Sequence, residues 1–397
     1  MTDQNQYIVN RSWVEVNLDA IRHNVQSIKS SIWRSSELMA VVKADAYGHG
    51  VRHVVPTLLD AGADRLAVSM LDEAIELRQN GVTAPILVLS YTDPRRADEI
   101  VKHHITQTVY SWDLVQAIDA AGARRGELVN VHIKVDTGMG RVGYVAGFNT
   151  IKAIEEISQL PYIAIEGIYT HFSTADAEDS TFVRKQFQTF LSLCQELERM
   201  GIYIPIKHCC NSAATIRYPE FALDMVRPGL ILYGQLPDNC EDFRSKLQPA
   251  IQLKTNVIHT KTVGKGFSIS YGRNFITERE SRIATVPIGY ADGYFRNLSG
   301  KAEALVAGYR VPVVGSICMD ACMLDVTDVP VDVAIGAEVV LIGSQTREDG
   351  TVETITAEEV AAWAGTISYE VLVVIGKRVP RVYTSEGQRV AVETVIL

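Results

Sequence analysis

The sequence predicts a (β/α)8 barrel of the TIM type followed by a mostly antiparallel β domain. Eight short apolar runs alternate with amphipathic segments between residues 38 and 227, which is the number and length of units that such a barrel needs. The runs are almost continuously apolar, as parallel strands buried on both faces are. After about residue 237, strand-like runs are joined by turns rich in glycine and charged residues. We therefore place the barrel at residues 14–240 and the β domain at residues 241–397, with residues 1–13 as an optional addition to the β domain.

The expected barrel strands are short. In chain order they cover residues 38–42, 65–69, 85–89, 105–109, 129–135, 162–168, 204–208 and 222–226. The clearest helix between them spans residues 180–200, where apolar side chains recur at helical spacing. Asp179 or Ser180 caps its start and Gly201 ends it. A doubly wound sheet is the competing fold, but it usually carries fewer strands before a break in strand order.

The β domain is expected to contain one helix only, at residues 357–364. A further strand at residues 13–18 fits either domain. The remaining expected strands lie within residues 255–264, 281–290, 303–315, 323–328 and 338–343.

Composition narrows the class of protein. The 397 residues are 47% hydrophobic and carry a formal net charge of −9 without a basic cluster, which gives no electrostatic case for nucleic acid or an anionic membrane. No apolar stretch approaches the roughly 18 residues of a transmembrane helix. Charged residues interrupt any apolar signal segment near the start, and the six cysteines lack a paired metal spacing. We therefore expect a cytoplasmic protein with reduced cysteines, no metal site and a small-molecule substrate.

Polar residues that follow barrel strands form the active face of such a barrel. Here these residues include a lysine, a histidine and two arginines, and in chain order they are Lys43, Asp136, Arg141, His171, Asn211, Ser212, Arg227 and Gly229. Burial beside an apolar strand lowers the pKa of a lysine and makes its amine nucleophilic, as a Schiff-base lysine requires. The alternative for Lys43 is a lysine at a strand end that reaches into solvent.

A phosphate site is predicted after the seventh and eighth strands, where barrels commonly bind phosphate through free backbone amides. Ser212 opens the helix after the seventh strand, and Gly229 and Leu230 follow the eighth. The alternative is that Asn211 or Ser212 only caps the helix. A strand-end lysine together with a phosphate site suggests pyridoxal phosphate.

Residues 138–143 match the dinucleotide pattern G-x-G-x-x-G, but their position disfavours that function. A dinucleotide fingerprint opens the first βα unit and runs straight into a helix. This run follows the fifth strand instead, and the next plausible helix starts only near Phe148.

Several long motifs are specific to one family. They are AVVKADAYGHG, KVDTGMGRVG, YTHFSTAD, NSAAT, VRPGLILYG, SYGR, PIGYADGY and CMD, and the match extends from WVEVNLDAI at Trp13 to PRVY near the end. The chain resembles the alanine racemase family of pyridoxal-phosphate-dependent enzymes. The resemblance implies a barrel-plus-β-domain fold and the interconversion of L-alanine and D-alanine by two bases on opposite faces of the substrate.

The resemblance also implies the residues that carry the chemistry. Lys43 holds the cofactor as a Schiff base and serves one face of the substrate. Tyr271 is the base for the other face and reaches in from the partner subunit, which implies a homodimer with shared active sites. The residues implied around the phosphate are Tyr47, Ser212, Gly229, Leu230 and Tyr369, with Asn211 at their flank.

The remaining implied roles concern the cofactor ring and the substrate carboxylate. Arg227 faces the pyridine nitrogen, and His171 links Arg227 to Tyr271. Arg141 binds the phenolic oxygen of the cofactor and assists the substrate carboxylate, which Met319 and Asp320 also line. Lys134 matches the family lysine that is carbamylated and braces Arg141.

The sequence departs from the family pattern near the expected entrance. Ser316 stands where the family commonly has arginine, Ala321 where it has glutamine and Phe295 where it has proline, while three entrance residues remain: Asp176, Tyr290 and Arg296. A short neutral serine predicts a wider mouth that is less attractive to a carboxylate. Racemisation of serine or of a broader set of amino acids therefore stays open.

Other functions also remain as alternatives. A barrel-type pyridoxal-phosphate decarboxylase shares the architecture, but it is expected to place a carboxylate at the pyridine nitrogen instead of Arg227. A regulatory barrel without catalysis would lack the β domain of about 150 residues. A nicotinamide-dependent oxidoreductase depends on the glycine-rich run of residues 138–143 alone.

Overall fold

The computed structural model describes residues 11–394, which divide into two compact units. The first, here called the barrel unit, contains residues 20–46 and 51–249. The second, the β unit, contains residues 250–394 together with residues 11–19 and 47–50 of the described chain. Of the residues 1–13 that the sequence left as an optional addition, residues 1–10 lie outside the described residues.

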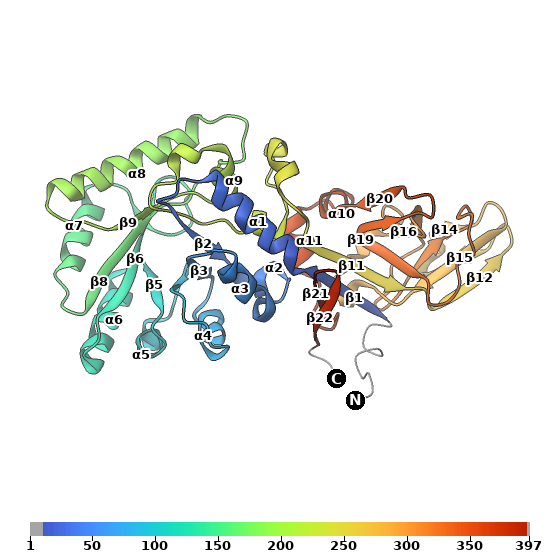
Figure 1. Ribbon diagram of the computed structural model, residues 1–397, viewed down its shortest axis with the longest axis horizontal. Coiled ribbons are helices and arrows are strands. Elements are labelled where there is room, and N and C mark those ends of the chain that lie inside the picture. Colours follow the sequence, from blue (N-terminus) through green and yellow to red (C-terminus); the bar gives the residue numbers. More distant parts are fainter. Residues whose placement is uncertain (1–10, 395–397) are drawn as a thin grey trace. The chain divides into compact units, whose positions relative to one another are not determined.

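The barrel unit contains a closed ring of eight parallel strands, which confirms the predicted fold class (Figure 1). The ring closes where β10 pairs with β2, through Met225 opposite Glu37, and where β5 pairs with β6. Three consecutive residues of β2, Leu38 to Ala40, are at most 1% exposed, so this strand is buried on both faces. The ring strands are β2 (Glu37–Val41), β3 (Arg65–Val68), β4 (Ile86–Val88), β5 (Thr106–Val109), β6 (Val129–Asp136), β8 (Ile163–Tyr169), β9 (Ile206–His208) and β10 (Met225–Val226). A short strand, β7 (Tyr144–Val145), pairs with the end of β6.

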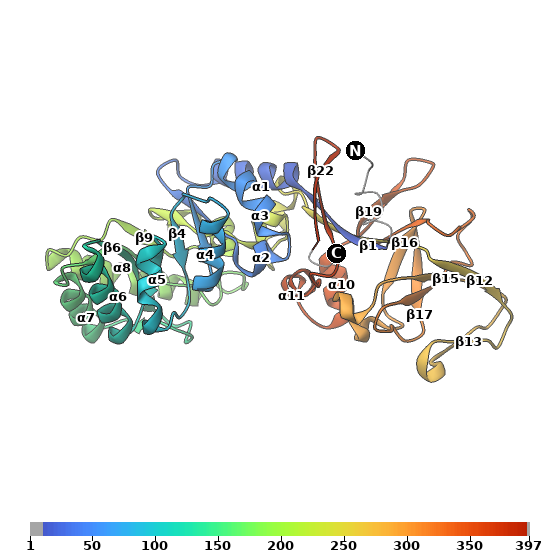
Figure 2. The ribbon, with the colours of Figure 1, turned by 90° about the horizontal axis from the view of Figure 1, so that it is seen from below.

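Helices lie outside the barrel strands, as Figures 1 and 2 show. The helix predicted at residues 180–200 is α8 (Thr181–Arg199), where Asp179 accepts a hydrogen bond from the Thr181 N–H and Gly201 adopts a positive φ of 81°. Its buried stripe, which includes Phe187 and Phe190, has the predicted helical spacing. The other helices of these βα units are α1 (Leu18–Ser31), α2 (Lys43–Tyr47), α3 (Val51–Asp60), α4 (Leu71–Gln79), α5 (Ala97–Lys102), α6 (Trp112–Arg125), α7 (Phe148–Ser158) and α9 (Ser212–Arg217).

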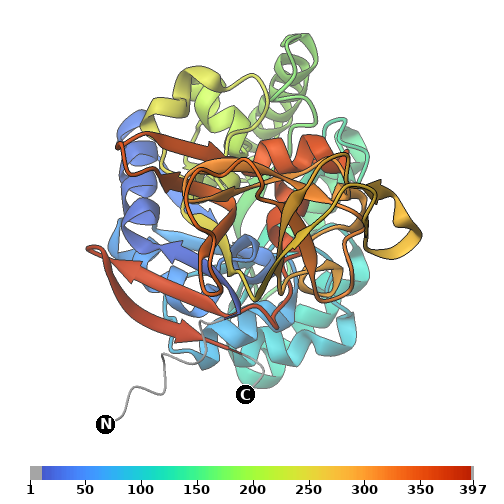
Figure 3. The same cartoon turned by 90° about the vertical axis from the view of Figure 1, so that its right-hand side faces the viewer.

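The β unit contains one large sheet in the order β12-β15-β18-β17-β16-β19-β11-β1-β21-β22, with β20 paired to β19. All of its pairings are antiparallel except that of β1 with β21. The hairpin of β21 and β22, red in Figure 3, lies at one edge of the sheet. The strands are β1 (Ser12–Asn17), β11 (Ile251–Asn256), β12 (His259–Val263), β15 (Ser281–Val286), β16 (Glu303–Val306), β17 (Tyr309–Val314), β18 (Cys322–Asp325), β19 (Glu338–Thr346), β20 (Val352–Ile355), β21 (Arg381–Ser385) and β22 (Gln388–Glu393).

Strand β1 belongs to the β unit, an assignment that the sequence left open. The expected barrel boundary at residue 14 placed most of this strand in the barrel. Its backbone pairs with β11 on one side and with β21 on the other. Val14 and Val16 are fully buried, so the strand is a central element of this sheet. The contacts also divide the chain between residues 249 and 250, later than the expected division at 240.

The expectation of a single helix in the β unit is wrong. Besides α10 (Ala357–Ala364), the unit contains α11 (Ser368–Val373) and a small two-stranded hairpin of β13 (Ser268–Ile269) and β14 (Phe275–Ile276). The α11 segment contains two valines, which favour strands, but packing buries Val371 and Leu372 to 3% exposure or less. Tertiary packing therefore decides the conformation of this short segment against its local preference.

No helix within residues 11–394 is long and apolar enough to cross a membrane.

Candidate active site

Lys43 begins α2 directly after β2, in a turn that has the left-handed conformation. Four consecutive non-glycine residues, 44 to 47, have φ angles of 52–55°. The Ala44 N–H donates to Glu73 Oε1 at 2.6 Å, and Asp45 Oδ1 accepts from the Val51 N–H at 2.7 Å. These two carboxylates hold a turn that costs about 1–2 kcal/mol per residue in L-amino acids. Local sequence does not reveal this turn, because Ala-Asp-Ala-Tyr reads as ordinary helix.

Lys43 is half-buried, and the pKa of its amine lies below the usual 10.5. Burial is the main cause, and the positive charge of Arg141 adds to it, while Glu73 acts in the opposite direction. Within the described residues, Lys43 forms no ion pair. A lowered pKa increases the fraction of the uncharged amine, which is the nucleophilic form.

Arg227 is 4% exposed and fixed at the end of β10. Its guanidinium donates to His208 Nδ1 at 2.8 Å, to the Thr170 carbonyl at 2.9 Å and to the Cys209 carbonyl at 3.3 Å. Burial lowers the pKa of Arg227, and in the described chain no carboxylate forms an ion pair with it. A buried guanidinium of this kind can accommodate an anionic or electron-rich ligand.

Four basic residues surround His171 in the barrel unit. The pKa of His171 is held well below 6.5 by burial first, and then by Arg227, Lys134, Arg141 and Lys43 in that order. Its Nδ1 atom lies 3.5 Å from Arg227 Nη2. The structure therefore brings together the strand-end cations that the sequence predicted.

Lys134 lies inside the barrel at 3% exposure. Its Nζ atom lies 4.8 Å from the centre of the Tyr169 ring and donates to the Val135 carbonyl at 3.5 Å. Burial, assisted by Arg227 and Arg141, holds its pKa well below 10.5. Asp136 acts in the opposite direction, but burial outweighs it.

The residues predicted for phosphate occur in both units. In the barrel unit, Asn211 Oδ1 caps α9 by accepting from the Ala214 N–H at 2.9 Å, which is the structural alternative named for this residue. Ser212 Oγ accepts from the Gly229 N–H at 2.9 Å, and its own hydroxyl proton is available to a ligand oxygen. Leu230 follows Gly229 at the start of the 3₁₀ helix η3 (Leu230–Tyr233) and is buried.

In the β unit, the rings of Tyr47 and Tyr369 have centroids 6.4 Å apart. Tyr369 lies on α11, the helix that the sequence did not predict. Burial and the neighbouring Tyr369 raise the pKa of Tyr47, so its hydroxyl keeps its proton and can donate it in a hydrogen bond.

The other predicted residues of the β unit are mainly exposed. Tyr271 lies in the short 3₁₀ turn η5 (Tyr271–Arg273) with 74% exposure, and Met319 has 53% exposure. Asp320 is paired with Arg378 at 2.6 Å, and Arg378 also contacts Asp292 at 3.0 Å.

The four residues predicted for the entrance have different surroundings. Tyr290 and Arg296 of the β unit are exposed, and Asp176 of the barrel unit accepts a hydrogen bond from Asn239 through its carbonyl. Ser316 differs from the expectation of an open channel residue: it is 4% exposed, and its hydroxyl donates to the Tyr271 carbonyl at 3.0 Å. The short side chain is thus enclosed within its own unit.

The glycine-rich run at residues 138–143 forms hydrogen bonds within its own loop. Asp136 accepts from the Gly138 N–H at 2.8 Å and from the Gly140 N–H at 3.0 Å, so these amides are already occupied. Helix α7 begins only at Phe148. The geometry agrees with the argument against a dinucleotide site.

Sequence reasoning missed a buried chain of polar residues behind Arg227. His208 and His132 share a hydrogen bond of 2.8 Å, and His132 lies 3.1 Å from Glu166 Oε2. His132 and Glu166 interrupt apolar strands β6 and β8, and this interruption was the available signal.

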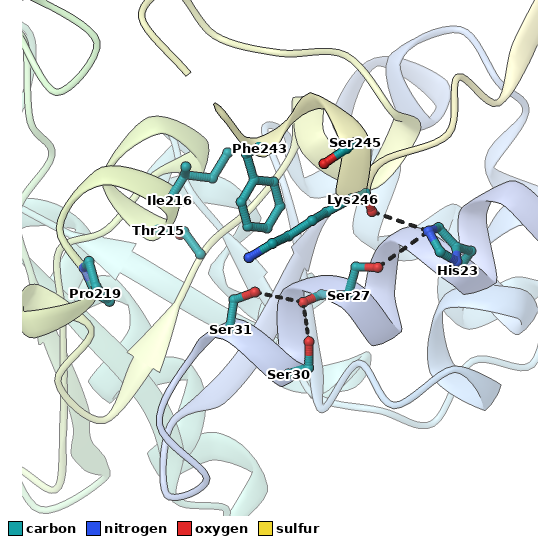
Figure 4. Close-up of a pocket in the computed structure, with 10 residues that line it drawn as sticks. All are labelled: His23, Ser27, Ser30, Ser31, Thr215, Ile216, Pro219, Phe243, Ser245 and Lys246. Carbon is teal, nitrogen blue, oxygen red and sulfur yellow. Dashed lines mark hydrogen bonds between the residues drawn. The ribbon is translucent and has the colours of Figure 1, made fainter. Parts of the chain in front are cut away.

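A pocket elsewhere in the barrel unit contains none of the predicted site residues (Figure 4). It lies among α1, α9 and the 3₁₀ helix η4 (Glu241–Lys246). Two of its serines, Ser30 and Ser31, donate to the carbonyl of Ser27, and Lys246 lies over the ring of Phe243 at 4.8 Å. These groups stabilise the helix and the loop. No group of three or more histidine, cysteine or acidic side chains in the described chain is arranged to hold a metal ion.

The two-part fold and the strand-end cations define a barrel-plus-β-domain enzyme. The alanine racemase N-terminal domain matches residues 16–237, and the alanine racemase C-terminal domain matches residues 250–383. Alanine racemase from Clostridium novyi is 45% identical over 385 residues, 97% of this chain and 98% of the relative; that from Clostridium tetani is 46% identical over 386 residues, with the same coverage.

Solved structures give the same result. Alanine racemase from Clostridium difficile 630 has a TM-score of 0.92 and 40% identity, and the match covers 98% of this chain and 100% of that one. Alanine racemase from Bacillus anthracis with bound L-Ala-P has a TM-score of 0.89 and 41% identity, over 97% of this chain and 98% of that one. The chain belongs to the alanine racemase family.

Proposed function

We propose that this chain interconverts L-alanine and D-alanine with pyridoxal 5′-phosphate as its cofactor. The observation that carries the proposal is the cluster of Lys43, Lys134, Arg141 and Arg227 around His171, with a strand-end lysine whose pKa is lowered. A cluster of cations suits a ligand that carries a phosphate, a phenolic oxygen and a carboxylate. Family membership supports the same substrate.

The residues present fit this cofactor. Pyridoxal phosphate supplies an aldehyde that condenses with an amine and a ring that makes the substrate α-proton acidic. Lys43 would bind the aldehyde carbon, and Arg141 would bind the phenolic oxygen and the substrate carboxylate, beside Met319 and Asp320. The groups that would hold the phosphate are Tyr47, Ser212, Gly229, Leu230 and Tyr369, with Asn211 at their flank.

Arg227 would donate a hydrogen bond to the pyridine nitrogen. A guanidinium keeps its proton at all accessible pH values, so Arg227 cannot stabilise a protonated ring as a carboxylate would. This chemistry favours racemisation over decarboxylation, for which a carboxylate at this position is expected.

Two bases would move the proton at the substrate Cα atom. Tyr271 would remove it from L-alanine and Lys43 from D-alanine, and each would return a proton on its own face. We propose that Tyr271 acts from the partner subunit of a homodimer, with His171 between Arg227 and Tyr271. The 74% exposure of Tyr271 in the single chain supports a role toward another molecule.

We further propose that Lys134 is carbamylated and braces Arg141. The uncharged amine is the form that attacks the carbon of CO2, which forms an N–C bond and releases one proton. The lowered pKa of Lys134 supports this modification.

The test is a racemisation assay of the purified holoenzyme with L-alanine, L-serine and L-lysine. We expect D-alanine as the main product, serine turnover below that of alanine, and loss of nearly all activity in Lys43→Ala. Lys152→Ala, an exposed lysine on α7, is the matched control and should retain activity. Borohydride reduction should attach the cofactor to the Lys43 peptide; attachment to another lysine, or release of CO2 as the main reaction, would overturn the proposal.

A further inference from the structure

The turn that carries Tyr271 has little support of its own. It connects β13 and β14, which pair through only Ser268 with Ile276 and Ile269 with Phe275. In Figure 2 this turn projects beyond β12 and β15 of the same unit. Ile269 and Phe275 pack into a small apolar cluster and anchor the base of the hairpin. The exposed ring of Tyr271 gains no comparable packing, so the backbone of the turn must set its position.

That backbone is in an unfavourable conformation. Ser270 and Arg273 have φ angles of 64° and 51°, and Gly272 between them has 75°. This region is sterically unfavourable for residues other than glycine, and such conformations persist only when their surroundings hold them. The turn therefore needs an external restraint.

Ser316 supplies this restraint from another segment of the β unit. Its hydroxyl donates to the Tyr271 carbonyl at 3.0 Å and accepts from Asn274 Nδ2 at 3.2 Å. The Ser316 carbonyl accepts from Ser270 Oγ at 2.6 Å. One buried residue thus binds the residue before Tyr271, Tyr271 itself and the residue that closes the turn.

The close approach of the two segments depends on Gly315. Its φ is 72°, and a Cβ atom there would lie 2.7 Å from the Ile269 carbonyl. A serine hydroxyl can donate and accept within this small space. An arginine, which is long and only donates, could not form the bond from Asn274.

We propose that Ser316 is a positioning residue for Tyr271: its hydroxyl holds the turn so that the phenol meets the substrate Cα atom. The inference rests on the proposed function, in which Tyr271 takes the proton of L-alanine. It replaces the expectation that Ser316 widens an entrance, because the side chain is buried and occupied by the turn.

The experiment uses the holoenzyme and α-deuterated L- and D-alanine. Because the two enantiomers have equal free energy, any variant lowers kcat/KM equally in both directions, and only the isotope effects distinguish the two bases. In Ser316→Ala, kcat/KM should fall about 10-fold, as small misplacements of a reacting group do. The isotope effect should rise with L-alanine, because removal of its proton becomes rate-limiting, and fall with D-alanine.

Two further variants complete the design. Asn274→Ala alters an exposed side chain and should shift both isotope effects in the same directions by a smaller amount. Ser281→Ala is the matched control, since Ser281 is 3% exposed in the same unit and donates to the Arg279 carbonyl at 3.2 Å, away from the turn. Its isotope effects should equal those of the parent.

Tyr271→Phe distinguishes a wrong base assignment from a wrong positioning role of Ser316. If it changes both isotope effects equally, Tyr271 is not the base for L-alanine and the two-base part of the proposed function is overturned. If it changes them in opposite directions while Ser316→Ala and Asn274→Ala behave like Ser281→Ala, the positioning role of Ser316 is wrong. Should Ser316→Ala fail to fold, Asn274→Ala decides the question alone.

Discussion

The buried chain behind Arg227 has one arrangement of protons. Arg227 can only donate, so His208 Nδ1 accepts and His208 Nε2 carries the proton that it donates to His132 Nδ1. His132 Nε2 then donates to Glu166. Burial is the main reason why the pKa of His208 lies well below 6.5. The guanidinium of Arg227 lowers this pKa further, because a second proton on His208 would face a positive charge.

This arrangement predicts a loss of stability as the pH falls below about 6.5, the pKa of histidine in the unfolded chain. The pKa values of His132, His171 and His208 are all lowered by burial, so in the native state these imidazoles bind protons at lower pH than they do in the unfolded chain. The free energy of unfolding should therefore fall with decreasing pH, by about 1.4 kcal/mol per pH unit for each histidine that remains neutral.

Urea unfolding at pH 7.5, 6.5, 5.5 and 4.8 measures this slope. Glu166 does not affect this slope. Burial opposes its ionisation, but its hydrogen bonds to His132 and Arg65 prevail and lower its pKa to about 2. The stability that ionised Glu166 contributes is therefore lost only below its unfolded pKa near 4.5. His132→Phe should reduce the slope, whereas the exposed His104→Gln should leave it unchanged. Equal slopes in all three proteins would contradict the prediction.

At the scale of elements, the left-handed turn after β2 should respond to an alanine-to-glycine substitution in the opposite way to a right-handed helix. Ala44 is exposed and has a φ of 52°, a conformation that glycine adopts without steric cost. Ala44→Gly should therefore leave the free energy of unfolding unchanged or raise it by up to about 1 kcal/mol. Ala120→Gly on the right-handed helix α6, also exposed, should lower it by about 1 kcal/mol. Thermal unfolding of both variants checks this; equal losses would show that the turn is not left-handed in solution.

The sequence could predict the elements that have a local pattern, but not those that depend on distant contacts. The barrel strands and α8 follow from apolar runs and helical spacing, because each pattern is local and burial on both faces demands it. The left-handed turn and α11 are not local: Glu73 holds the first from 29 residues away, and packing of Val371 and Leu372 stabilises the second.

The candidate site divides in the same way. Lys43, His171 and Arg227 could be found from their positions after strands, since parallel strands bring their ends to one face. Tyr271 could be found only from a family motif. The contact of Ser316 with Tyr271 joins residues 45 apart in the chain and depends on the approach of two loops, so no local sequence pattern predicts it.

For the whole molecule, the division into units is not a single point in the chain. Residues 11–19 and 47–50 join the β unit because β1 pairs with β11 and β21, and Gly48 meets α11 so closely that a Cβ atom would lie 2.6 Å from the Leu372 carbonyl. A single boundary drawn from composition cannot represent such a crossing.

The proposed sharing of active sites between subunits is tested by mixing two variants that each lack one base and retain little activity. Lys43→Ala retains Tyr271, and Tyr271→Phe retains Lys43. In a mixed dimer with shared sites, one site combines Lys43 of one subunit with Tyr271 of the other and is intact, while the second site lacks both. Random exchange makes half of the dimers mixed, so an equal mixture should regain about one quarter of the parent activity.

The recovery of activity should depend on subunit exchange, and one mixture serves as its control. It should appear only after the two variants have exchanged subunits, for example by dilution and reconcentration or by coexpression, and it should grow with the fraction of mixed dimers separated by affinity tags. A mixture of Lys43→Ala with a double variant that lacks both bases should remain inactive, because it contains no intact Lys43. If coexpressed Lys43→Ala and Tyr271→Phe form mixed dimers but remain inactive, both bases must come from one chain. The exposed Tyr271 would then act within its own subunit, and the homodimer would not be needed to complete the site.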